Sequence, residues 1–432
     1  MMSSDMLKAL IIFLITYIMI SGINFKRFRL GRNAGVLIGA VLMVAAKVAS
    51  PEEMYSFVNW DTIVLLLGMM IVIEHLAEAE FFEIITEWLD RKNFSLKNLL
   101  LIEVFGVGIL SAFLVNDIVC IFMTPLFLIM IRKRNLPSLP FLLGIATSSN
   151  IGSAMAFTGN PQNMIIGSLS GIPYQEFFFK MLPVGIIGLF INYFLIRLIF
   201  RKDFENSEYG EKRLRNPSED GKERKITGER EPEFYTKPLL IKSLIVMAGI
   251  IIGFFIFPNI AWVAFAGAAV LLLVSNRNEN RILMKADWTL LMFFALLFAV
   301  VGALNSTGIT EKIFYSIDGL FENSLLGYIK FSAAALIGSN IFGNVPYVLI
   351  VSDIISELSN SRVYWYILAY ISTIAGNLTI IGSVANVIVV EKAGSFCRIS
   401  LKDFVKLGIP SVILTAVSGF AVLYIYIAAG II

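Results

Sequence analysis

The sequence predicts an all-α membrane protein that crosses the bilayer many times, and three observations support this fold class. Of its 432 residues, 57% are hydrophobic and 16% are charged, whereas about a quarter of the residues are charged in soluble domains. Several apolar runs approach the roughly 20 residues that a helix needs to cross a bilayer. The order of these runs repeats once, on either side of a charged stretch near the middle of the chain.

Residues 1–200 form the first predicted transmembrane repeat. Its apolar run at 96–131 is interrupted by Asn116-Asp117, which predicts a re-entrant hairpin. The segment 79–90 alternates large apolar residues with acids, as a helix lying in the membrane interface does. The expected elements are helices at about 6–23, 31–49 and 60–76, the interfacial helix at 79–90, the hairpin at about 96–131, a broken helix at about 139–169 and a crossing at 177–200.

A charged segment, 201–238, separates the two halves. It is rich in basic and acidic residues and contains almost no large apolar side chains. Such a composition cannot bury a core. We expect a solvated linker here.

Residues 239–432 form the second predicted repeat, with the same order of elements. Its hairpin is interrupted at Gly343-Asn344 rather than at an acid. The expected elements are crossings at about 239–257, 261–274 and 288–304, the hairpin at about 325–358, a broken helix at about 364–390 and a crossing at 404–427.

The halves also match residue by residue, with equal spacing inside each matching pair. Internal repeats of this kind are common in secondary transporters. The matching pairs are Ser111 and Asn116 with Ser339 and Asn344, and Gly159 and Asn163 with Gly382 and Asn386.

The charge distribution predicts an inverted repeat. If each hairpin enters and leaves on the same side, each half crosses an odd number of times, and the second half is inverted. The basic clusters at 91–97 and 132–134 then lie on one side, which agrees with the positive-inside rule. We therefore expect about 10 transmembrane helices, two re-entrant hairpins and two broken helices. Both termini would lie outside the plasma membrane, and the linker 201–238 would be cytoplasmic.

Polar residues break both crossings that follow the hairpins. Half-helices that point into the membrane present free N–H groups, which suit an anion, and free carbonyls, which suit a cation. Glycine and asparagine also serve simply for close helix packing in membranes. The candidate site residues are Asn150, Gly159, Asn160, Pro161 and Asn163 in the first broken helix, and Gly376, Asn377, Thr379, Gly382, Ser383 and Asn386 in the second.

The hairpin tips, Asn116-Asp117 and Asn344, complete the candidate site. A carboxylate inside the membrane costs several kcal/mol, so Asp117 is interpreted as a proton carrier or as a ligand for a cation. The alternative is that it caps the second arm of the hairpin. A sodium ion is possible near Asn116, Asp117 and Asn160, and a second near Asn344 and Asn377.

Other functional classes find no support in the sequence. There is no P-loop, no dinucleotide-binding turn and no hydrolase motif, so neither an enzyme nor a resident cofactor other than Na⁺ is expected. Nothing suggests nucleic acid binding. Cys120 and Cys397 are interpreted as apolar fillers. Glu103 is expected to reach the inner interface.

Four stretches resemble the ion transporter superfamily: "LVNDIVCIFMTPLFL", "SSNIGSAMAFTGNPQNMIIGSLSGI", "GSNIFGNVP" and "AGNLTIIGSVANVIV". That group includes arsenite permeases, NhaD-type sodium/proton antiporters, citrate carriers and divalent anion:sodium symporters. The resemblance implies inverted repeats, a homodimer and an elevator-like movement of the hairpin domain.

The hairpin tips depart from the sodium symporters of that group, whose tips carry a Ser-Asn-Thr motif. Here they read Val115-Asn116-Asp117 and Gly343-Asn344-Val345, so the asparagines match and the hydroxyls do not. The Asn-Asp pair is more similar to the arsenite permease and antiporter branches. The "TGNPQN" form is similar to uncharacterised anion permeases of the group.

These observations predict a secondary active transporter for a small anion, either an arsenite-like oxyanion or a carboxylate. Transport would be coupled to H⁺ or Na⁺ and would use elevator-type alternating access. The alternatives are a Na⁺/H⁺ antiporter without an anion substrate and a passive channel.

Overall fold

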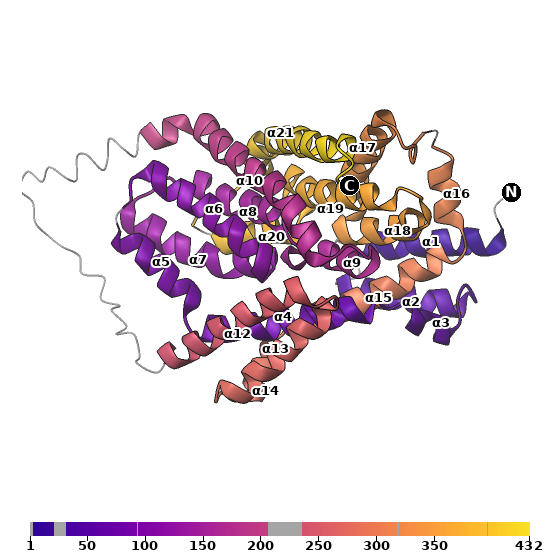
Figure 1. The fold of residues 1–432 in the computed structure, drawn as a ribbon, viewed down its shortest axis with the longest axis horizontal. Helices are drawn as coiled ribbons and strands as arrows, with labels where there is room; N and C mark the ends of the chain where they lie inside the picture. The colour runs from indigo at the N-terminus through magenta and orange to yellow at the C-terminus, as the bar shows by residue number, and fades with distance from the viewer. Residues whose placement is uncertain (1–2, 21–31, 93, 206–235, 318, 395) are drawn as a thin grey trace, which may run out of the picture.

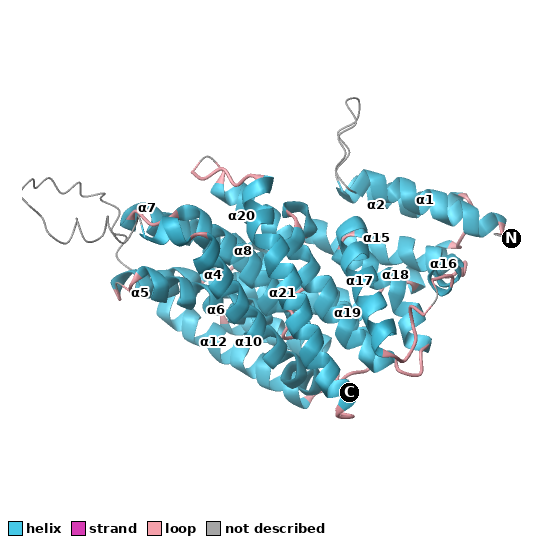
Figure 2. Cartoon of the chain, turned by 90° about the horizontal axis from the view of Figure 1, so that it is seen from above, coloured by secondary structure: helices cyan, strands magenta, loops and turns pink. Residues whose placement is uncertain are grey.

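The computed structural model describes residues 3–20, 32–92, 94–205, 236–317, 319–394 and 396–432. Within these residues all regular structure is helical (Figure 2). Seven of the described helices are long and apolar enough to cross a membrane. The predicted all-α, multi-crossing fold class is confirmed.

The first half contains the predicted hairpin and the predicted broken helix (Figure 1). Its helices are α1 (Ser4–Ile20), α2 (Arg32–Ala45), α3 (Pro51–Ser56), α4 (Trp60–Glu78), α5 (Phe81–Arg91), α6 (Leu96–Leu114), α7 (Asn116–Arg134), α8 (Ser138–Ser153), η1 (Phe157–Gly159), α9 (Pro161–Leu169) and α10 (Tyr174–Ile199).

The second half repeats this order. Its helices are α12 (Thr236–Ile256), α13 (Ile260–Val274), α14 (Glu279–Lys285), α15 (Trp288–Asn305), α16 (Ile309–Tyr315), α17 (Leu325–Phe342), α18 (Asn344–Glu357), α19 (Ser361–Ala375), η2 (Gly376–Leu378), η3 (Ile380–Gly382), α20 (Val384–Ala393) and α21 (Leu401–Ala428).

Three short helices, α3, α14 and α16, were not predicted, because each is too short to show a periodic apolar pattern. Two reciprocal hydrogen bonds cap the start of α3. The Ser50 hydroxyl accepts a hydrogen bond from the Glu53 N–H, and the Glu53 carboxylate accepts one from the Ser50 N–H. These hydrogen bonds also lower the pKa of Glu53. The Asn278 side chain caps α14 by accepting a single hydrogen bond from the Arg281 N–H.

Most of the predicted linker, residues 206–235, lies outside the described residues. The described ends differ from the expectation. Residues 201–205 are helical, and Phe204 is buried against Phe141 of α8, with the ring centroids 6.3 Å apart. The helix α12 begins at Thr236, inside the predicted linker.

The hairpins and the broken helices pack against one another across the two halves. The second arm of the first hairpin, α7, lies against α20, the last part of the second broken helix. In the reciprocal arrangement, α18 of the second hairpin lies against α9 of the first broken helix. In Figure 1 the helices α12, α13 and α14 lie below this bundle, and α21 lies above it.

Two glycines, Gly108 and Gly152, allow α6 and α8 to pack closely together. A Cβ atom at Gly152 would lie 2.1 Å from the carbonyl oxygen of Gly108, so the two backbones are in direct contact. Small residues permit such close approach between membrane helices. In this conformation the contact holds the first arm of the hairpin against the first broken helix.

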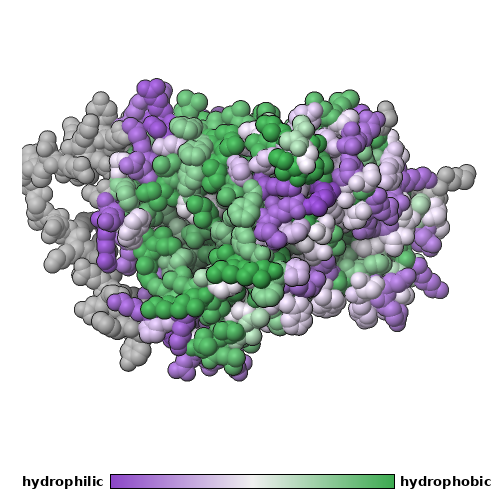
Figure 3. Space-filling view, in the orientation of Figure 1, coloured by the Kyte–Doolittle hydropathy of each residue, from purple (hydrophilic) through white to green (hydrophobic). Residues whose placement is uncertain are grey.

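Large apolar side chains remain exposed on the outer helices, as Figure 3 shows over much of one face. A soluble monomer rarely exposes an apolar surface of this extent. It is the surface that a lipid bilayer would cover. Examples are Phe190, Phe194 and Leu198 of α10, Ile241 and Ile245 of α12, and Ile413 and Val417 of α21.

Candidate functional site

The first broken helix is interrupted by an extended residue. Asn160 has φ −159° and ψ 161°, and its side chain accepts from the backbone N–H of Asn163 at 2.9 Å. Pro161 occupies the first position of α9, where no N–H donor is needed. Gly159 allows the turn, because a Cβ there would lie 2.1 Å from the Ser153 carbonyl oxygen.

The second broken helix is interrupted twice, at extended residues Thr379 and Ser383. Two short 3-10 turns, η2 and η3, lie on either side of Thr379. A Cβ at Gly382 would lie 2.8 Å from the carbonyl oxygen of Gly376, so these two predicted glycines allow the two turns to approach closely.

One asparagine in each broken helix satisfies the carbonyls freed by the break, and the two do so identically. The Asn163 amide nitrogen donates to the carbonyls of Ser153 and Ala156, at 3.3 and 3.4 Å. The Asn386 amide nitrogen donates to the carbonyls of Gly376 and Thr379, at 2.7 and 3.1 Å. The same number of positions separates each residue of the first set from its counterpart in the second, as an internal repeat requires.

Asn150 joins the two broken helices and the first hairpin. Its amide nitrogen donates to the side-chain oxygens of Asn377 and Asn386, at 2.8 and 3.1 Å. Its side-chain oxygen accepts from the Asn116 amide and the Ser383 hydroxyl, both at 2.9 Å. An amide can make about four hydrogen bonds, so the hydrogen-bonding capacity of Asn150 is filled within the protein.

The hairpin tips end beside the two breaks. Both tips turn at a residue with positive φ, which is 64° at Val115 and 83° at Gly343. Asn116 follows the first turn and bonds Asn150. Asn344 follows the second, and a Cβ at Gly376 would lie 3.4 Å from its amide nitrogen. The predicted residues of both tips and both breaks therefore meet in one polar centre.

Asp117 is partly buried at this centre. Its carboxylate lies close to the backbone N–H of Ala385, in the first turn of α20, and interacts with the charge of Arg32. A helix N-terminus favours negative charge. A carboxylate of the protein itself thus lies where the second broken helix could hold an anion.

Several buried oxygens of the centre have no hydrogen-bond partner: Asn116 Oδ1, Asn163 Oδ1, Asn344 Oδ1, Ser111 Oγ and Ser339 Oγ. Asn116 Oδ1 and the Asp117 carboxylate offer oxygens to a cation, and so does Asn344 Oδ1 at the other tip. The side-chain oxygens of Asn160 and Asn377 already accept hydrogen bonds. Among the described residues, no three His, Cys, Asp or Glu side chains gather to hold a metal ion.

Sequence reasoning missed Thr373 as a member of the centre. Its hydroxyl accepts from the amides of Asn160 and Gln162, both at 3.3 Å. Thr373 is the repeat counterpart of Asn150, just as Ser383 is the counterpart of Asn160. The repeat spacing was the signal that could have identified it.

The expectation that Glu103 reaches the inner interface is wrong. Its side chain is buried between α6 and α8, and neither carboxyl oxygen has a hydrogen-bond partner. An apolar helix with one acid does not reveal which face the acid occupies, so only the packing of α8 decides its surroundings.

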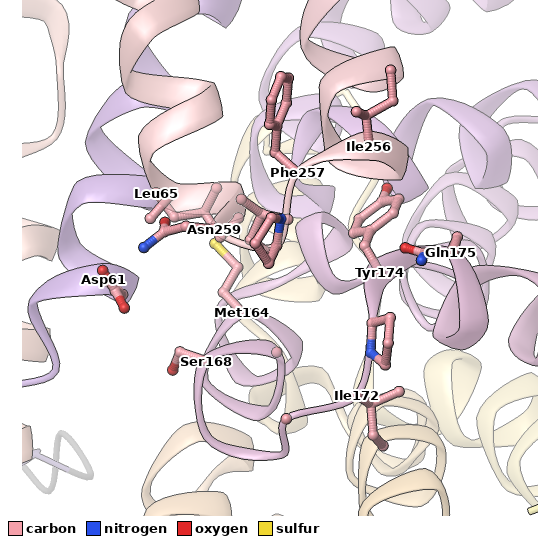
Figure 4. A pocket seen from close by; sticks show the side chains of 16 residues that line it. Asp61, Leu65, Met164, Ser168, Ile172, Tyr174, Gln175, Ile256, Phe257 and Asn259 are labelled. Atoms are coloured by element: carbon pink, nitrogen blue, oxygen red, sulfur yellow. The ribbon is translucent and has the colours of Figure 1, made fainter.

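A cavity of about 470 Å³ lies outside the polar centre (Figure 4). Its wall comes from α4, α9, the start of α10 and the turn between α12 and α13, and it includes Asp61, Ser168, Gln175 and Asn259. None of the predicted site residues lines it.

The model of the family described as "Citrate transporter" matches residues 11–364, which is most of the chain. The chain belongs to this family. Membership agrees with the predicted ion transporter superfamily and with a multi-pass membrane transporter. The hairpins and broken helices described above are therefore those of a member of the citrate transporter family.

Curated relatives of this member of the citrate transporter family carry different names. A transporter of Dictyostelium discoideum named arsB is 29% identical, over 95% of this chain and 90% of its own. The silicon efflux transporter LSI3 of Oryza sativa subsp. japonica is 28% identical, over 90% and 92%. A 46 kDa membrane protein of Mycobacterium leprae is 28% identical, over 95% and 96%.

The YdaH transporter of Alcanivorax borkumensis, described as having an unusual topology, has a similar fold. The TM-score is 0.59 at 14% identity, covering 99% of this chain and 98% of the other. At this identity the likeness concerns the fold alone.

Proposed function

We propose that the protein is a secondary active transporter that moves a small anion across the membrane, coupled to H⁺ or Na⁺. The substrate would be an arsenite-like oxyanion or a carboxylate. One observation carries the proposal: the Asp117 carboxylate lies at the N-terminus of α20, within a buried centre formed by both hairpin tips and both broken helices.

This position suggests how the two fluxes are coupled. An anion at the N-terminus of α20 and a charged Asp117 would repel each other in a medium of low dielectric constant. Proton or Na⁺ binding at Asp117 removes that repulsion. The helix end then becomes available to the anion, so anion binding requires the coupling ion.

The proposed substrate class is based on the names of the family and of one relative. The family is named for citrate, and one relative carries the name arsB. Amide donors and helix N-termini suit both oxyanions and carboxylates. The described part of the centre has no arginine pair that would clamp a large polycarboxylate, which favours a small anion.

The family resemblance of the sequence also leads us to propose a homodimer and elevator-type movement of the hairpin helices. We propose that the protein lies in the plasma membrane and, from the charge distribution, that both termini lie outside and the segment 201–238 lies in the cytoplasm. Permeabilisation-dependent labelling of single cysteines placed at Ser3 and Ser218 would test the orientation.

The test uses purified protein in proteoliposomes with arsenite, citrate and silicic acid as probes, under imposed pH and Na⁺ gradients. We expect accumulation of at least one probe that depends on one gradient. Asp117→Asn should abolish the pH or Na⁺ dependence, because an amide neither releases a proton nor attracts a cation strongly. Unchanged pH and Na⁺ dependence in this variant would contradict the role of Asp117.

The same assay separates the alternatives. A Na⁺/H⁺ antiporter without an anion substrate would move protons in response to a Na⁺ gradient alone. A passive channel would equilibrate the probe without accumulating it.

A further inference from the structure

Glu103 occupies an unusual place that the proposed coupling at Asp117 does not use. It lies in α6, the first arm of the first hairpin, and its side chain faces Gly144 of α8. A Cβ atom at Gly144 would lie 3.1 and 3.3 Å from the two carboxyl oxygens. The missing side chain of Gly144 thus leaves room for the carboxyl group between the two helices.

Among the residues that the structure describes, no charged group pairs with this carboxyl. Four elements pack on α6, namely α7, α8, α10 and η1, and α8 and η1 contain no ionisable residue. None of the described ionisable groups on α6, α7 or α10 forms a hydrogen bond or an ion pair with the Glu103 carboxyl. Apart from Glu103 itself, the ionisable residues of α6, α7 and α10 are Lys97, Asp117, Cys120, Arg132, Lys133, Arg134, Tyr174, Glu176, Lys180, Tyr193 and Arg197.

The packing therefore suits only the neutral acid. A charge buried without a partner is strongly unfavourable, and such a group either takes up a proton or leaves its site. Loss of the proton from Glu103 would push the carboxylate out of the contact between α6 and α8.

The fold does not require an acid at this position. Glu103 precedes Asn116 by the same number of residues as Phe331 precedes Asn344. Phe331 is fully buried between α17 and α19 and packs on Tyr364, with the ring centroids 5.0 Å apart. An apolar side chain thus fills the equivalent place in the second repeat.

We propose that Glu103 is a proton-binding site of the transport cycle, whose occupancy holds the first hairpin against the first broken helix. With the proton bound, α6 packs on α8 and the Asn116-Asp117 tip stays beside Asn150. When the proton leaves, the carboxylate needs water, α6 separates from α8, and the tip withdraws from the polar centre. The link to anion movement rests on the proposed function, whereas the proton site itself does not.

Infrared difference spectroscopy of the full-length protein in lipid tests the proton site without any substrate. The wild type should show the C=O band of a buried protonated carboxyl group at neutral pH, and the band should disappear at high pH. Glu103→Gln should lack this band. Asp117→Asn and Glu52→Gln should keep it, the latter because Glu52 is exposed on α3. An identical band in wild type and Glu103→Gln would overturn the proposal.

Proton movement during transport provides the second measurement, with a pH dye inside proteoliposomes and labelled arsenite or citrate outside. Glu103→Gln should keep exchange of the labelled anion but move one proton fewer per anion, because a proton carried by Asp117 would remain. Its pH dependence should weaken by the contribution of one proton, which is at most about tenfold per pH unit. Unchanged proton movement in Glu103→Gln would refute the coupling role. If Glu103→Gln does not fold, Glu103→Leu serves in its place, because Phe331 shows that an apolar residue fits.

The two proposals can fail separately. If no tested anion is transported but the Glu103 band titrates, the proposed function fails and the proton site stands. If the wild type transports an anion and no band belongs to Glu103, the transport function stands and the inference is wrong.

Discussion

At the scale of single residues, asparagine builds the polar centre because its amide both donates and accepts hydrogen bonds. Asn163 and Asn386 use their amide nitrogens to satisfy the carbonyls that the helix breaks set free. Asn150 uses both ends of its amide to connect three elements. Most of these asparagines could be predicted from the sequence as members of a site, but their distinct roles could not.

Asn150→Ala should destabilise the protein and reduce transport. It leaves Asn116, Asn377, Asn386 and Ser383 each without one hydrogen-bond partner, and a buried unsatisfied group costs about 1–3 kcal/mol. We expect a loss of at least about 2 kcal/mol in the free energy of unfolding in detergent. Transport of the probe anion in proteoliposomes should fall as well.

The matched control for this substitution is Asn98→Ala, which removes the side-chain amide of an exposed residue on α6. Equal stability of the two variants would show that the network around Asn150 is not what holds the centre together.

At the scale of elements, the hairpins and broken helices follow from local interruptions of apolar runs. Asn116-Asp117 and Gly343-Asn344 lie at the hairpin turns, and Gly159 to Pro161 lies at the helix break, as predicted. The contact between α6 and α8 does not follow from local sequence. In the sequence, nothing distinguishes Gly108 and Gly152 from other glycines in apolar segments. Only the fold brings their backbones together.

Gly152→Ala should separate α6 from α8. The added methyl group would lie 2.1 Å from the Gly108 carbonyl oxygen, and neither backbone can yield easily. Overpacking typically costs about 1–3 kcal/mol, so the melting temperature should fall and the first hairpin should become more accessible to proteolysis.

Gly106→Ala is the matched control on α6, because a Cβ there meets no atom within 4 Å. It should be neutral or stabilising by up to about 1 kcal/mol. Similar losses in both variants would argue against direct backbone contact between α6 and α8.

At the scale of the whole molecule, two halves with the same order of elements share one centre, and each hairpin packs against the broken helix of the other half. The second hairpin also contacts α1, where Phe342 beside the tip packs on Tyr17 with the ring centroids 5.4 Å apart. Elevator movement would separate α1 from this tip.

A cross-link between α1 and this tip should therefore stop transport. We expect Tyr17→Cys combined with Phe342→Cys to lose activity on oxidation and to recover it on reduction. Cys120 and Cys397 would first be replaced by serine. The measurement is uptake of the probe anion by proteoliposomes before and after each treatment.

Phe105→Cys with Phe190→Cys provides the control within the hairpin bundle. These residues join α6 to α10, with ring centroids 4.7 Å apart, and elevator movement leaves them together. The oxidised pair should therefore keep anion exchange in the Glu103→Gln background, in which α6 stays packed on α8. Full activity of the oxidised Tyr17–Phe342 pair would rule out relative movement at this contact.

The sequence by itself determined the membrane class, the order of elements and the positions of the hairpin tips and helix breaks, because apolar run length and its polar interruptions are local properties. The tertiary structure alone decided that Asn150 is saturated, that Asp117 lies at the N-terminus of α20, and that Glu103 is buried against Gly144. These features depend on distances between segments far apart in the chain, and only packing sets such distances.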